Sequence, residues 1–308
     1  MRVAVTGASG RLGRALIEAL EAAPFTGPKG PIAWSRPEFD LDTLTVESVG
    51  ALIERDRPEL VIHAAAWTDV DGCAKDPALA MRRNATATGL VAEACVGYHA
   101  HLAVISTNEV FDGTRTDGQG YGPYDRRNPI NAYGASKAEA ERLASGAMFE
   151  DELMPLAIVR TSWLHGPPGN DFPAKIAAAA IRARAAGEPL RVVGDEIGSP
   201  TYAPDVAEAI VELIGEDELC PESELARYHH LVNRGRASRA EWAREVLRAT
   251  AIDVQVEEVP ASTWQRASTP PLWAVLEPTP LPSGEPMRHW RDAFADAVPA
   301  LLRSLRQG

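Results

Sequence analysis

The chain has 308 residues, of which 45% are hydrophobic and 24% charged, and this length suffices for one domain with a full hydrophobic core and a smaller lobe. The net charge of −12 argues against nucleic acid or an anionic membrane as a partner, and no apolar stretch approaches the ~20 residues needed to span a bilayer. Three cysteines are too few for a disulfide framework, and the first strand begins too early to leave room for a signal peptide, so we expect a cytoplasmic protein.

Short apolar runs alternate with helical patterns through the first half of the chain, which is typical of a parallel α/β sheet. We expect strands at residues 2–6, 31–35, 60–63, 102–106 and 156–160, and helices at residues 11–22, 46–55, 78–97 and 132–146. The expected fold is a Rossmann-type, doubly wound parallel sheet. Residues 1–163 should form this dinucleotide-binding domain, and the chain should return to it near residues 200–232.

After residue 163 the pattern changes, and we expect residues 164–308 to form mainly a substrate-binding lobe and a closing helix. Helices are expected at residues 172–186, 204–214, 238–249 and 290–305, and strands at residues 190–193 and 228–232. Ser238, followed three residues later by Glu241, predicts a capping box. The stretch 260–289 lacks periodicity, but four large apolar residues favour an ordered loop over the core rather than disorder: Trp264, Leu272, Trp273 and Leu276.

Three glycines follow the first expected strand and open the first expected helix. Gly7, Gly10 and Gly13 stand at G-x-x-G-x-x-G spacing, in the context that a dinucleotide-binding turn requires. They would provide a tight turn, close approach to a pyrophosphate and close helix-to-strand packing, and the phosphates would meet free N–H groups at the helix N-terminus. The simpler interpretation is an ordinary strand-to-helix turn.

The end of the second expected strand indicates which dinucleotide is bound. NAD-selective sites usually place Asp or Glu there, whereas this strand is followed by Arg36, and an arginine suits a 2′-phosphate. We therefore expect NADPH as the cofactor, with NADH as the alternative, unless Arg36 is an ordinary surface charge. Asp40 either contacts the adenine amino group or only shapes a turn. The small residues 64–66 either let the dinucleotide lie across the sheet edge or serve helix-to-sheet packing.

Tyr133 and Lys137 are four residues apart on an expected helix and therefore lie on one face. Reduction of a carbonyl needs a hydride at carbon and a proton at oxygen, and a tyrosine can supply the proton. The opposite charge of Lys137 is expected to lower the pKa of Tyr133, and its ammonium group can also hold the nicotinamide ribose. A hydroxyl at the end of the fourth strand would bind the substrate oxygen. Thr107 is the candidate and Ser106 its competitor, because strand alternation lets only one of them face the site. The alternative for Tyr133 is an ordinary residue of an amphipathic helix.

No metal site is expected in this chain. None of the cysteines and histidines stands at a metal-ligand spacing. The adjacent His229 and His230 cannot place both rings on one face of a strand. The expected cofactors therefore include no metal ion.

Together these motifs resemble a known family. The glycine turn, Thr107 and the pair Tyr133 and Lys137 are similar to those of the extended short-chain dehydrogenase/reductases, and within them the chain resembles the dTDP-4-dehydrorhamnose reductases. The supporting segments are RPELVIHAAAWTDVD (57–71), STNEVFDG (106–113), NAYGASK (131–137), RTSW (160–163) and GSPT (198–201), and the closing WRD (290–292) also fits. The resemblance covers roughly residues 1–250.

The resemblance implies an NAD(P)H-dependent oxidoreductase that reduces a 4-keto-6-deoxy nucleotide sugar, as in dTDP-rhamnose biosynthesis, with hydride transferred to C4. It implies Tyr133 as the acid, Lys137 as its electrostatic and ribose partner, and Thr107 as the donor to the substrate oxygen. The implied cofactor contacts are Gly10, Arg11, Leu12, Asp40, Leu41, Ala66 and Trp67, and the implied substrate contacts are Thr68, Asn108 and Trp163. Asn84 matches a helix asparagine that supports the site. The implied binding partner is the nucleotide-sugar substrate. A second copy of the chain, in a homodimer, is the other partner that we consider.

The chain departs from the family pattern at several points. Asn108 and Glu109 replace the usual Asp-Tyr after the threonine, and His63 replaces the asparagine before three alanines. A usual acidic residue is missing near residues 73–74, and the C-terminal Arg-Pro…Asn-Ser pattern is poorly kept around residues 266–276. We therefore expect the chemistry to be retained and the sugar preference to differ. Two alternatives share the fold: a nucleotide-sugar epimerase or dehydratase with tightly bound NAD, and a non-catalytic subunit resembling the beta subunit of methionine adenosyltransferase.

Overall fold

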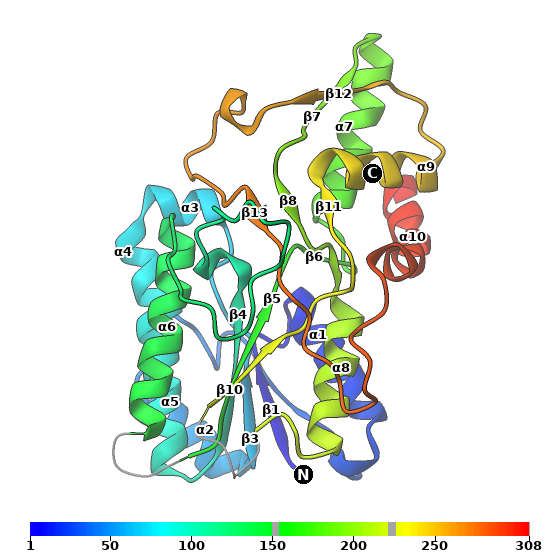
Figure 1. Cartoon of the computed structure of the whole chain (residues 1–308). Helices are drawn as coiled ribbons and strands as arrows, with labels where there is room; N and C mark the ends of the chain where they lie inside the picture. The colour runs from blue at the N-terminus through cyan, green and yellow to red at the C-terminus, as the bar shows by residue number, and fades with distance from the viewer. Residues whose placement is uncertain (150–153, 221–225, 308) are drawn as a thin grey trace.

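The computed structural model describes residues 1–149, 154–220 and 226–307, and its central feature is a parallel sheet (Figure 1). Within these residues the sheet has six strands in the order β10-β5-β4-β3-β1-β2, and each neighbouring pair is parallel. Its strands are β1 (Val3–Thr6), β2 (Ile32–Trp34), β3 (Leu60–His63), β4 (His101–Thr107), β5 (Leu156–Thr161) and β10 (Ala226–His230). The strand order reverses between β1 and β3, and ligands of such sheets bind outside the carboxyl ends of the strands at this reversal. The predicted Rossmann-type sheet is confirmed.

Helices cover both faces of the sheet (Figure 1). On one face, α1 (Arg11–Ala22) packs against α8 (Ala203–Gly215). On the other face, α5 (Ala87–Gly97) packs between α2 (Val46–Asp56) and α6 (Ala132–Phe149). Because helices bury both faces, the strands consist of nearly continuous apolar residues rather than alternating ones.

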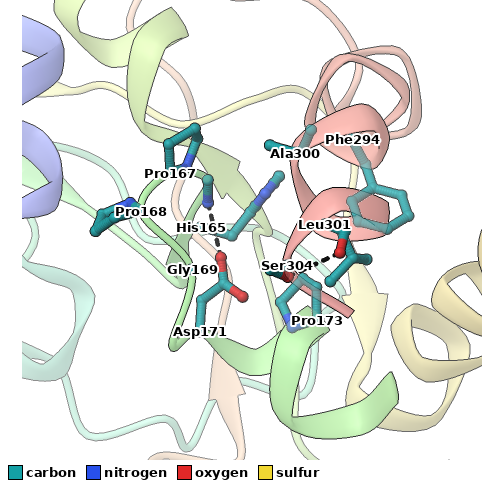
Figure 2. A pocket seen from close by; sticks show the side chains of 12 residues that line it. His165, Pro167, Pro168, Gly169, Asp171, Pro173, Phe294, Ala300, Leu301 and Ser304 are labelled. Carbon is teal, nitrogen blue, oxygen red and sulfur yellow. Dashed lines mark hydrogen bonds between the residues drawn. The ribbon is translucent and has the colours of Figure 1, made fainter. Parts of the chain in front are cut away.

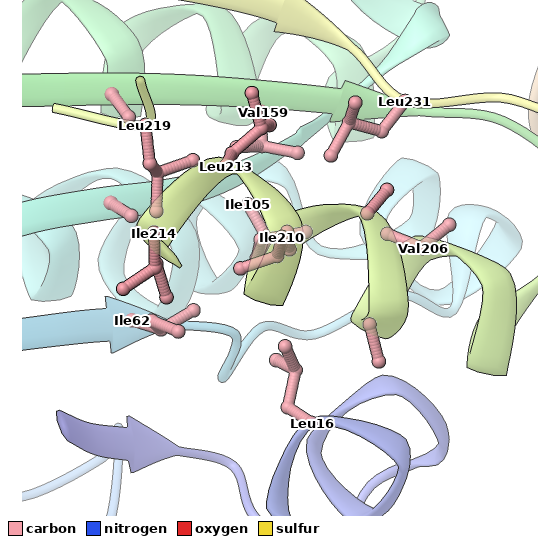
Figure 3. Close-up of a cluster of buried hydrophobic side chains, with 14 of the residues drawn as sticks. Leu16, Ile62, Ile105, Val159, Val206, Ile210, Leu213, Ile214, Leu219 and Leu231 are labelled. Atoms are coloured by element: carbon pink, nitrogen blue, oxygen red, sulfur yellow. The ribbon is translucent and has the colours of Figure 1, made fainter. Parts of the chain in front are cut away.

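Alternate strand residues supply two separate hydrophobic cores. Ile62, Ile105 and Val159 point toward α1 and α8, where Figure 3 shows them near Leu16 and Ile210. The strand residue just before each of these three belongs to the second core, beneath α2, α5 and α6. Successive side chains of a strand point to opposite faces, so each strand anchors helices on both sides. The carboxyl ends of the strands are thereby held in a rigid row.

A second group of elements forms a smaller lobe beyond the carboxyl edge of the sheet (Figure 1). Its helices and short strands are α7 (Phe172–Ala186), α9 (Arg239–Thr250), α10 (Trp290–Gln307), β6 (Leu164–His165), β7 (Leu190–Val193), β8 (Ile197–Gly198), β9 (Thr201–Tyr202), β11 (Ala237–Ser238), β12 (Val256–Val259) and β13 (Trp273–Ala274). Its core includes the buried rings of Trp242, Trp290 and Phe294. Two elements that come after residue 163, α8 and β10, lie with the large sheet, in the range 200–232 where the chain was expected to return to it. The division of the chain into two domains at residue 163 stays a prediction. No helix in the described ranges is both long and apolar enough to cross a membrane.

The predicted capping box at the start of α9 is confirmed. The Ser238 hydroxyl accepts a hydrogen bond from Glu241 N at 3.0 Å, and Glu241 Oε2 accepts one from Ser238 N at 2.7 Å. These two bonds satisfy N–H groups that have no partner inside the helix. These bonds fix the first turn of α9, which begins at Arg239.

The helix expected over residues 78–97 is instead made of three parts. A short helix α4 (Pro77–Ala80) is followed by the π-helical turn η2 (Met81–Thr86) and then by α5. A π turn changes the backbone hydrogen-bond step without changing which residues are apolar, so the sequence pattern does not reveal it. The helix α3 (Val70–Lys75) was also not predicted, since its six residues are too few to show a helical period.

The stretch 260–289 is ordered but covers the core only in part. It contains the 3-10 helix η4 (Ala261–Thr263) and β13, and Leu276 is buried against Tyr121. Trp264 and Leu272, however, are 50% and 46% exposed, so the expectation that they cover the core is wrong. Composition alone does not show which side of an irregular loop faces the protein. Two further 3-10 helices are η1 (Pro24–Thr26) and η3 (Asn108–Val110).

Candidate active site

The glycine turn between β1 and α1 is packed too closely for any other residue. Gly7 has a φ of +64°, and a Cβ atom there would lie 2.8 Å from Ala65 Cα. A Cβ atom at Gly13 would lie 2.2 Å from Gly7 O. Gly10 caps α1, and no described side chain bonds to the first N–H groups of this helix. Unpaired N–H groups at a helix N-terminus attract phosphate, so the turn fits a pyrophosphate group.

Two adjoining cavities follow the carboxyl edge of the sheet. One has a volume of about 460 Å³ and extends from the glycine turn toward α6 and α9. The other has a volume of about 310 Å³ and extends toward the end of β2. They share Gly7, Gly10, Ala64 and Ala66 and therefore form one groove. All the predicted site residues line it: Gly7, Gly10, Arg11, Leu12, Gly13, Ala66, Thr68, Thr107, Asn108, Tyr133, Lys137 and Trp163 in the larger cavity, and Arg36, Asp40, Leu41 and Trp67 in the smaller.

Thr107, the last residue of β4, brings its hydroxyl group to Tyr133. The two side chains share a hydrogen bond. The Thr107 hydroxyl also accepts a hydrogen bond from Glu109 N at 3.2 Å and so begins η3. Ser106 points the other way, where its hydroxyl donates to Glu141 Oε1 at 2.5 Å. Strand alternation thus places Thr107, and not Ser106, beside Tyr133.

The electrostatic surroundings of Tyr133 differ from the sequence-based expectation. Burial raises the pKa of Tyr133, the Glu109 carboxylate raises it further, and the hydrogen bond with Thr107 opposes both. The expectation that Lys137 lowers the pKa of Tyr133 is therefore wrong. Lys137 is itself only 2% exposed, and burial lowers its pKa to about 8 against the opposing effect of the Glu141 carboxylate. The sequence pattern predicts the two residues but not the electrostatic surroundings of either group.

Asn84 fixes the loop after β3 against α6. Its Oδ1 accepts a hydrogen bond from Trp67 N at 2.7 Å, and its Nδ2 donates to Trp67 O at 3.1 Å. Nδ2 also donates to Ser136 Oγ at 3.0 Å, and this hydroxyl donates to Tyr133 O at 2.7 Å. Asn84 therefore supports the site from behind, without lining either cavity.

Two arginines at the β2 end of the groove have different surroundings. Arg83 donates to both oxygens of Asp42, at 2.7 and 2.6 Å, and its guanidinium lies 5.3 Å from the centroid of the Trp67 ring. Arg36 is exposed and forms no hydrogen bond or ion pair with any residue that the structure describes. A guanidinium without a carboxylate partner remains available to a phosphate group.

Arg11 joins the glycine turn to the loop after β6. Its Nε donates to Gly166 O at 3.1 Å and its Nη2 to Gly169 O at 2.6 Å. Asp171 closes this loop by accepting a hydrogen bond from Gly166 N at 2.8 Å, as drawn in Figure 2. Behind the loop, Figure 2 shows the buried His165 ring at a separate cavity of about 80 Å³. Arg11 thus lines the larger cavity with its guanidinium already bound to two carbonyl groups.

At its far end, the larger cavity adjoins a third one between α7, β7 and α9. Arg239 lines both, and its guanidinium lies 3.5 Å from the centroid of the Trp163 ring. The buried Glu196 forms ion pairs with Arg239 and with Arg266. The third cavity has a volume of about 340 Å³ and is lined by Phe172, Lys175, Ile176, Arg191, Val192, Val193, Glu196, Arg239, Trp264 and Arg266.

Two charged residues that line the larger cavity were not among the predicted site residues. Glu109 was noticed only as a departure from the family pattern, and that departure was its one signal. Arg239 follows the cap of α9 and looks in the sequence like an ordinary exposed helix residue. Only the folded chain shows that its guanidinium covers Trp163.

In the described ranges, no group of three or more His, Cys, Asp or Glu side chains could hold a metal ion. The rings of the adjacent His229 and His230 have different surroundings on β10. His229 Nε2 lies 3.2 Å from Leu219 O, whereas the His230 ring centroid lies 5.9 Å from that of Phe111. This separation follows from the alternation of strand side chains.

Known proteins match this chain over nearly its whole length. The family described as the RmlD substrate binding domain matches residues 1–303. A dTDP-4-dehydrorhamnose reductase of Streptomyces griseus is 32% identical over 302 residues, which cover 96% of this chain and 93% of that protein. The crystal structure of a dTDP-4-dehydrorhamnose reductase from Clostridium acetobutylicum has a TM-score of 0.84 at 28% identity and covers 100% of both chains. That of a dTDP-4-dehydrorhamnose reductase from Bacillus anthracis in complex with NADP has a TM-score of 0.78 at 31% identity, covering 100% of this chain and 99% of the other.

Proposed function

The chain belongs to the RmlD substrate binding domain family, and from this membership we propose that it reduces the C4 ketone of a 4-keto-6-deoxy nucleotide sugar with NADPH. It is an NAD(P)H-dependent oxidoreductase of the dTDP-4-dehydrorhamnose reductase type. One observation carries the proposal: Thr107, Tyr133 and Lys137 line the same cavity as a glycine turn that fits a pyrophosphate.

The proposed chemistry assigns a separate task to each of the three side chains. When bound, the dinucleotide supplies the hydride that goes to C4. The Thr107 and Tyr133 hydroxyls hold the ketone oxygen, and Tyr133 gives it a proton. Because burial and Glu109 raise the pKa of Tyr133, the phenol stays protonated at neutral pH and is available as the acid. The Lys137 ammonium stabilises the negative charge that develops on the oxygen.

The third cavity supports a nucleotide as the remote part of the substrate. Its cationic side chains, among them Lys175 and Arg191, suit a diphosphate. Its aromatic side chains, Phe172 and Trp264, offer flat apolar surfaces to a base. Because Arg239 lines this cavity and the larger one, a single extended ligand can reach from there to Tyr133.

The proposal is tested by following NADPH oxidation with a panel of 4-keto-6-deoxy nucleotide sugars that differ in nucleotide and sugar. We expect turnover with at least one member and rapid exchange of the dinucleotide after each cycle. If the protein oxidises NADPH with no member of the panel, the proposal is overturned. NAD that copurifies and survives dilution would favour an epimerase or dehydratase instead.

Replacing Arg36 with aspartate should shift the cofactor preference from NADPH toward NADH. The substitution removes a guanidinium available to the 2′-phosphate and adds a charge that repels it. We expect the ratio of kcat/KM for NADPH to that for NADH to fall by about tenfold or more, the value of a charge-assisted hydrogen bond. Lys29→Asp, an exposed change at the other end of β2, is the control. An unchanged ratio in Arg36→Asp would remove Arg36 from the cofactor site.

The pH dependence of reduction should report the charge of Lys137. Its pKa is lowered to about 8, so the ammonium loses its proton as the pH rises through this value. We expect kcat/KM to be constant at lower pH and to fall above about 8. Lys137→Arg keeps a positive charge throughout this range, and its profile should lack the inflection. The same inflection in both proteins would assign it to another group.

A further inference from the structure

The Glu109 carboxylate lies beside Tyr133 in the larger cavity. Glu109 belongs to η3, which directly follows β4. Its backbone packs against the start of α6 so closely that a Cβ atom at Gly134 would lie 2.1 Å from Glu109 O. Gly134 follows Tyr133 in the chain, and the Glu109 carboxylate acts electrostatically on the Tyr133 phenol. The acid of the proposed reaction therefore has a carboxylate as its neighbour.

Asn131 holds one oxygen of this carboxylate and leaves the other open. Its Nδ2 donates to Glu109 Oε2 at 2.6 Å and to Thr269 O at 3.0 Å, while its Oδ1 accepts from Gly134 N at 2.8 Å. A single amide thus connects η3, the start of α6 and the loop at Thr269. Glu109 Oε1 accepts no hydrogen bond from the residues that the structure describes, and Glu109 lines the cavity. The carboxylate is fixed in place with one acceptor remaining for a ligand.

The cations near Glu109 are already paired with another carboxylate. Arg239 and Arg266 lower the pKa of Glu109, and burial, which is the larger effect, raises it. Both guanidinium groups form their ion pairs with Glu196. Asp71 also acts electrostatically on Arg266, so both guanidinium groups have carboxylate neighbours other than Glu109. Glu109 Oε1 is therefore not used by these cations and can accept a hydrogen bond from a ligand, for which the hydroxyl groups of a sugar ring are suitable donors.

We propose that Glu109 is a specificity-determining residue whose free oxygen accepts a hydrogen bond from a hydroxyl group on the ring carbon next to the ketone. The inference rests on the proposed function, which places the ketone oxygen at Tyr133. In a 4-keto-6-deoxy sugar, C5 carries a methyl group and the ring oxygen, and neither donates a hydrogen bond. The donor must therefore be on C3. The preferred substrate class is the 3-hydroxy-4-ketone, because a 3-deoxy sugar that fills the cavity leaves the Glu109 oxygen without a hydrogen-bond donor.

The test compares kcat/KM for two nucleotide-linked 4-keto-6-deoxy sugars that differ only in having a hydroxyl group or a hydrogen atom at C3. We expect the wild-type protein to prefer the 3-hydroxy sugar by about 10- to 100-fold, as for a hydrogen bond to a charged group. Glu109→Leu should bring this ratio close to one. Glu109→Gln keeps a weaker, neutral acceptor and should give an intermediate ratio. Glu93→Leu, an exposed change on α5, should keep the wild-type ratio.

Each outcome of this comparison either supports or overturns the proposed role of Glu109. A wild-type ratio near one overturns the inference without any variant, so the test does not depend on whether Glu109→Leu folds. A wild-type ratio retained in a folded Glu109→Leu protein also overturns it. A 3-amino sugar reduced more efficiently than the 3-hydroxy sugar would show selection of a cation instead, and the inference would fail. If the wild-type protein reduces neither sugar and no other 4-ketone, the proposed function fails, and the inference falls with it.

Discussion

Replacing Tyr133 with phenylalanine is expected to lower kcat for ketone reduction by about 10²- to 10⁴-fold, the usual contribution of a positioned acid. Phenylalanine keeps the ring of the side chain and so keeps the shape of the cavity. It removes the hydroxyl group that shares a hydrogen bond with Thr107 and that would protonate the ketone oxygen. NADPH affinity should hardly change, because the glycine turn lies at the other end of the cavity.

Steady-state kinetics with the preferred 4-ketone and a fluorescence titration with NADPH separate these two effects. Tyr124→Phe is the matched control, since Tyr124 is 74% exposed and lines neither cavity of the groove. The control should behave as the wild type in both measurements. Near-normal turnover by Tyr133→Phe would refute the assignment of Tyr133 as the acid. A large loss of NADPH affinity would show that the Tyr133 hydroxyl group supports cofactor binding rather than the chemistry.

The substitution Glu141→Gln is expected to destabilise the protein by about 3–5 kcal/mol, the cost of leaving a buried charge without its partner. Arg160 Nη2 lies 2.7 Å from Glu141 Oε2, and the two side chains are 2% and 0% exposed. Glutamine has nearly the same size, so the change removes the charge and little else. Because Glu141 is on α6 and Arg160 on β5, the pair joins the helix that carries Tyr133 to the sheet.

Urea unfolding followed by circular dichroism measures this loss as a lower midpoint at an unchanged slope. The control is Glu139→Gln on the same helix, where the ion pair with Arg142 has side chains 35% and 61% exposed. An exposed pair contributes little, because water already solvates both charges and salt screens them. Equal shifts of the midpoint in the two variants would show that burial does not decide the strength of these pairs.

Features that depend on neighbouring residues were predictable from the sequence. The strands of the large sheet are continuous apolar runs, the glycines stand at the spacing of a phosphate-binding turn, and Ser238 with Glu241 caps α9 as expected. The choice of Thr107 over Ser106 required the fold, because alternation shows only that the two point in opposite directions. The π turn at Asn84 was missed, since it changes backbone bonding without changing the apolar pattern.

Local spacing and side-chain chemistry therefore specified the Rossmann-type sheet, its glycine turn and the placement of Tyr133 and Lys137 on one helix beside the same cavity. The folded chain alone decided the environment in which this pair works. A pKa depends on burial and on charges in space, and Glu109 reaches Tyr133 through a contact between η3 and α6 that no local pattern contains. Arg239 likewise meets Trp163 only because the lobe folds over the sheet edge. Short motifs thus predicted a reductase, whereas long-range contacts determine which charges remain available to a ligand, because these contacts set the burial and the partners of each charged group.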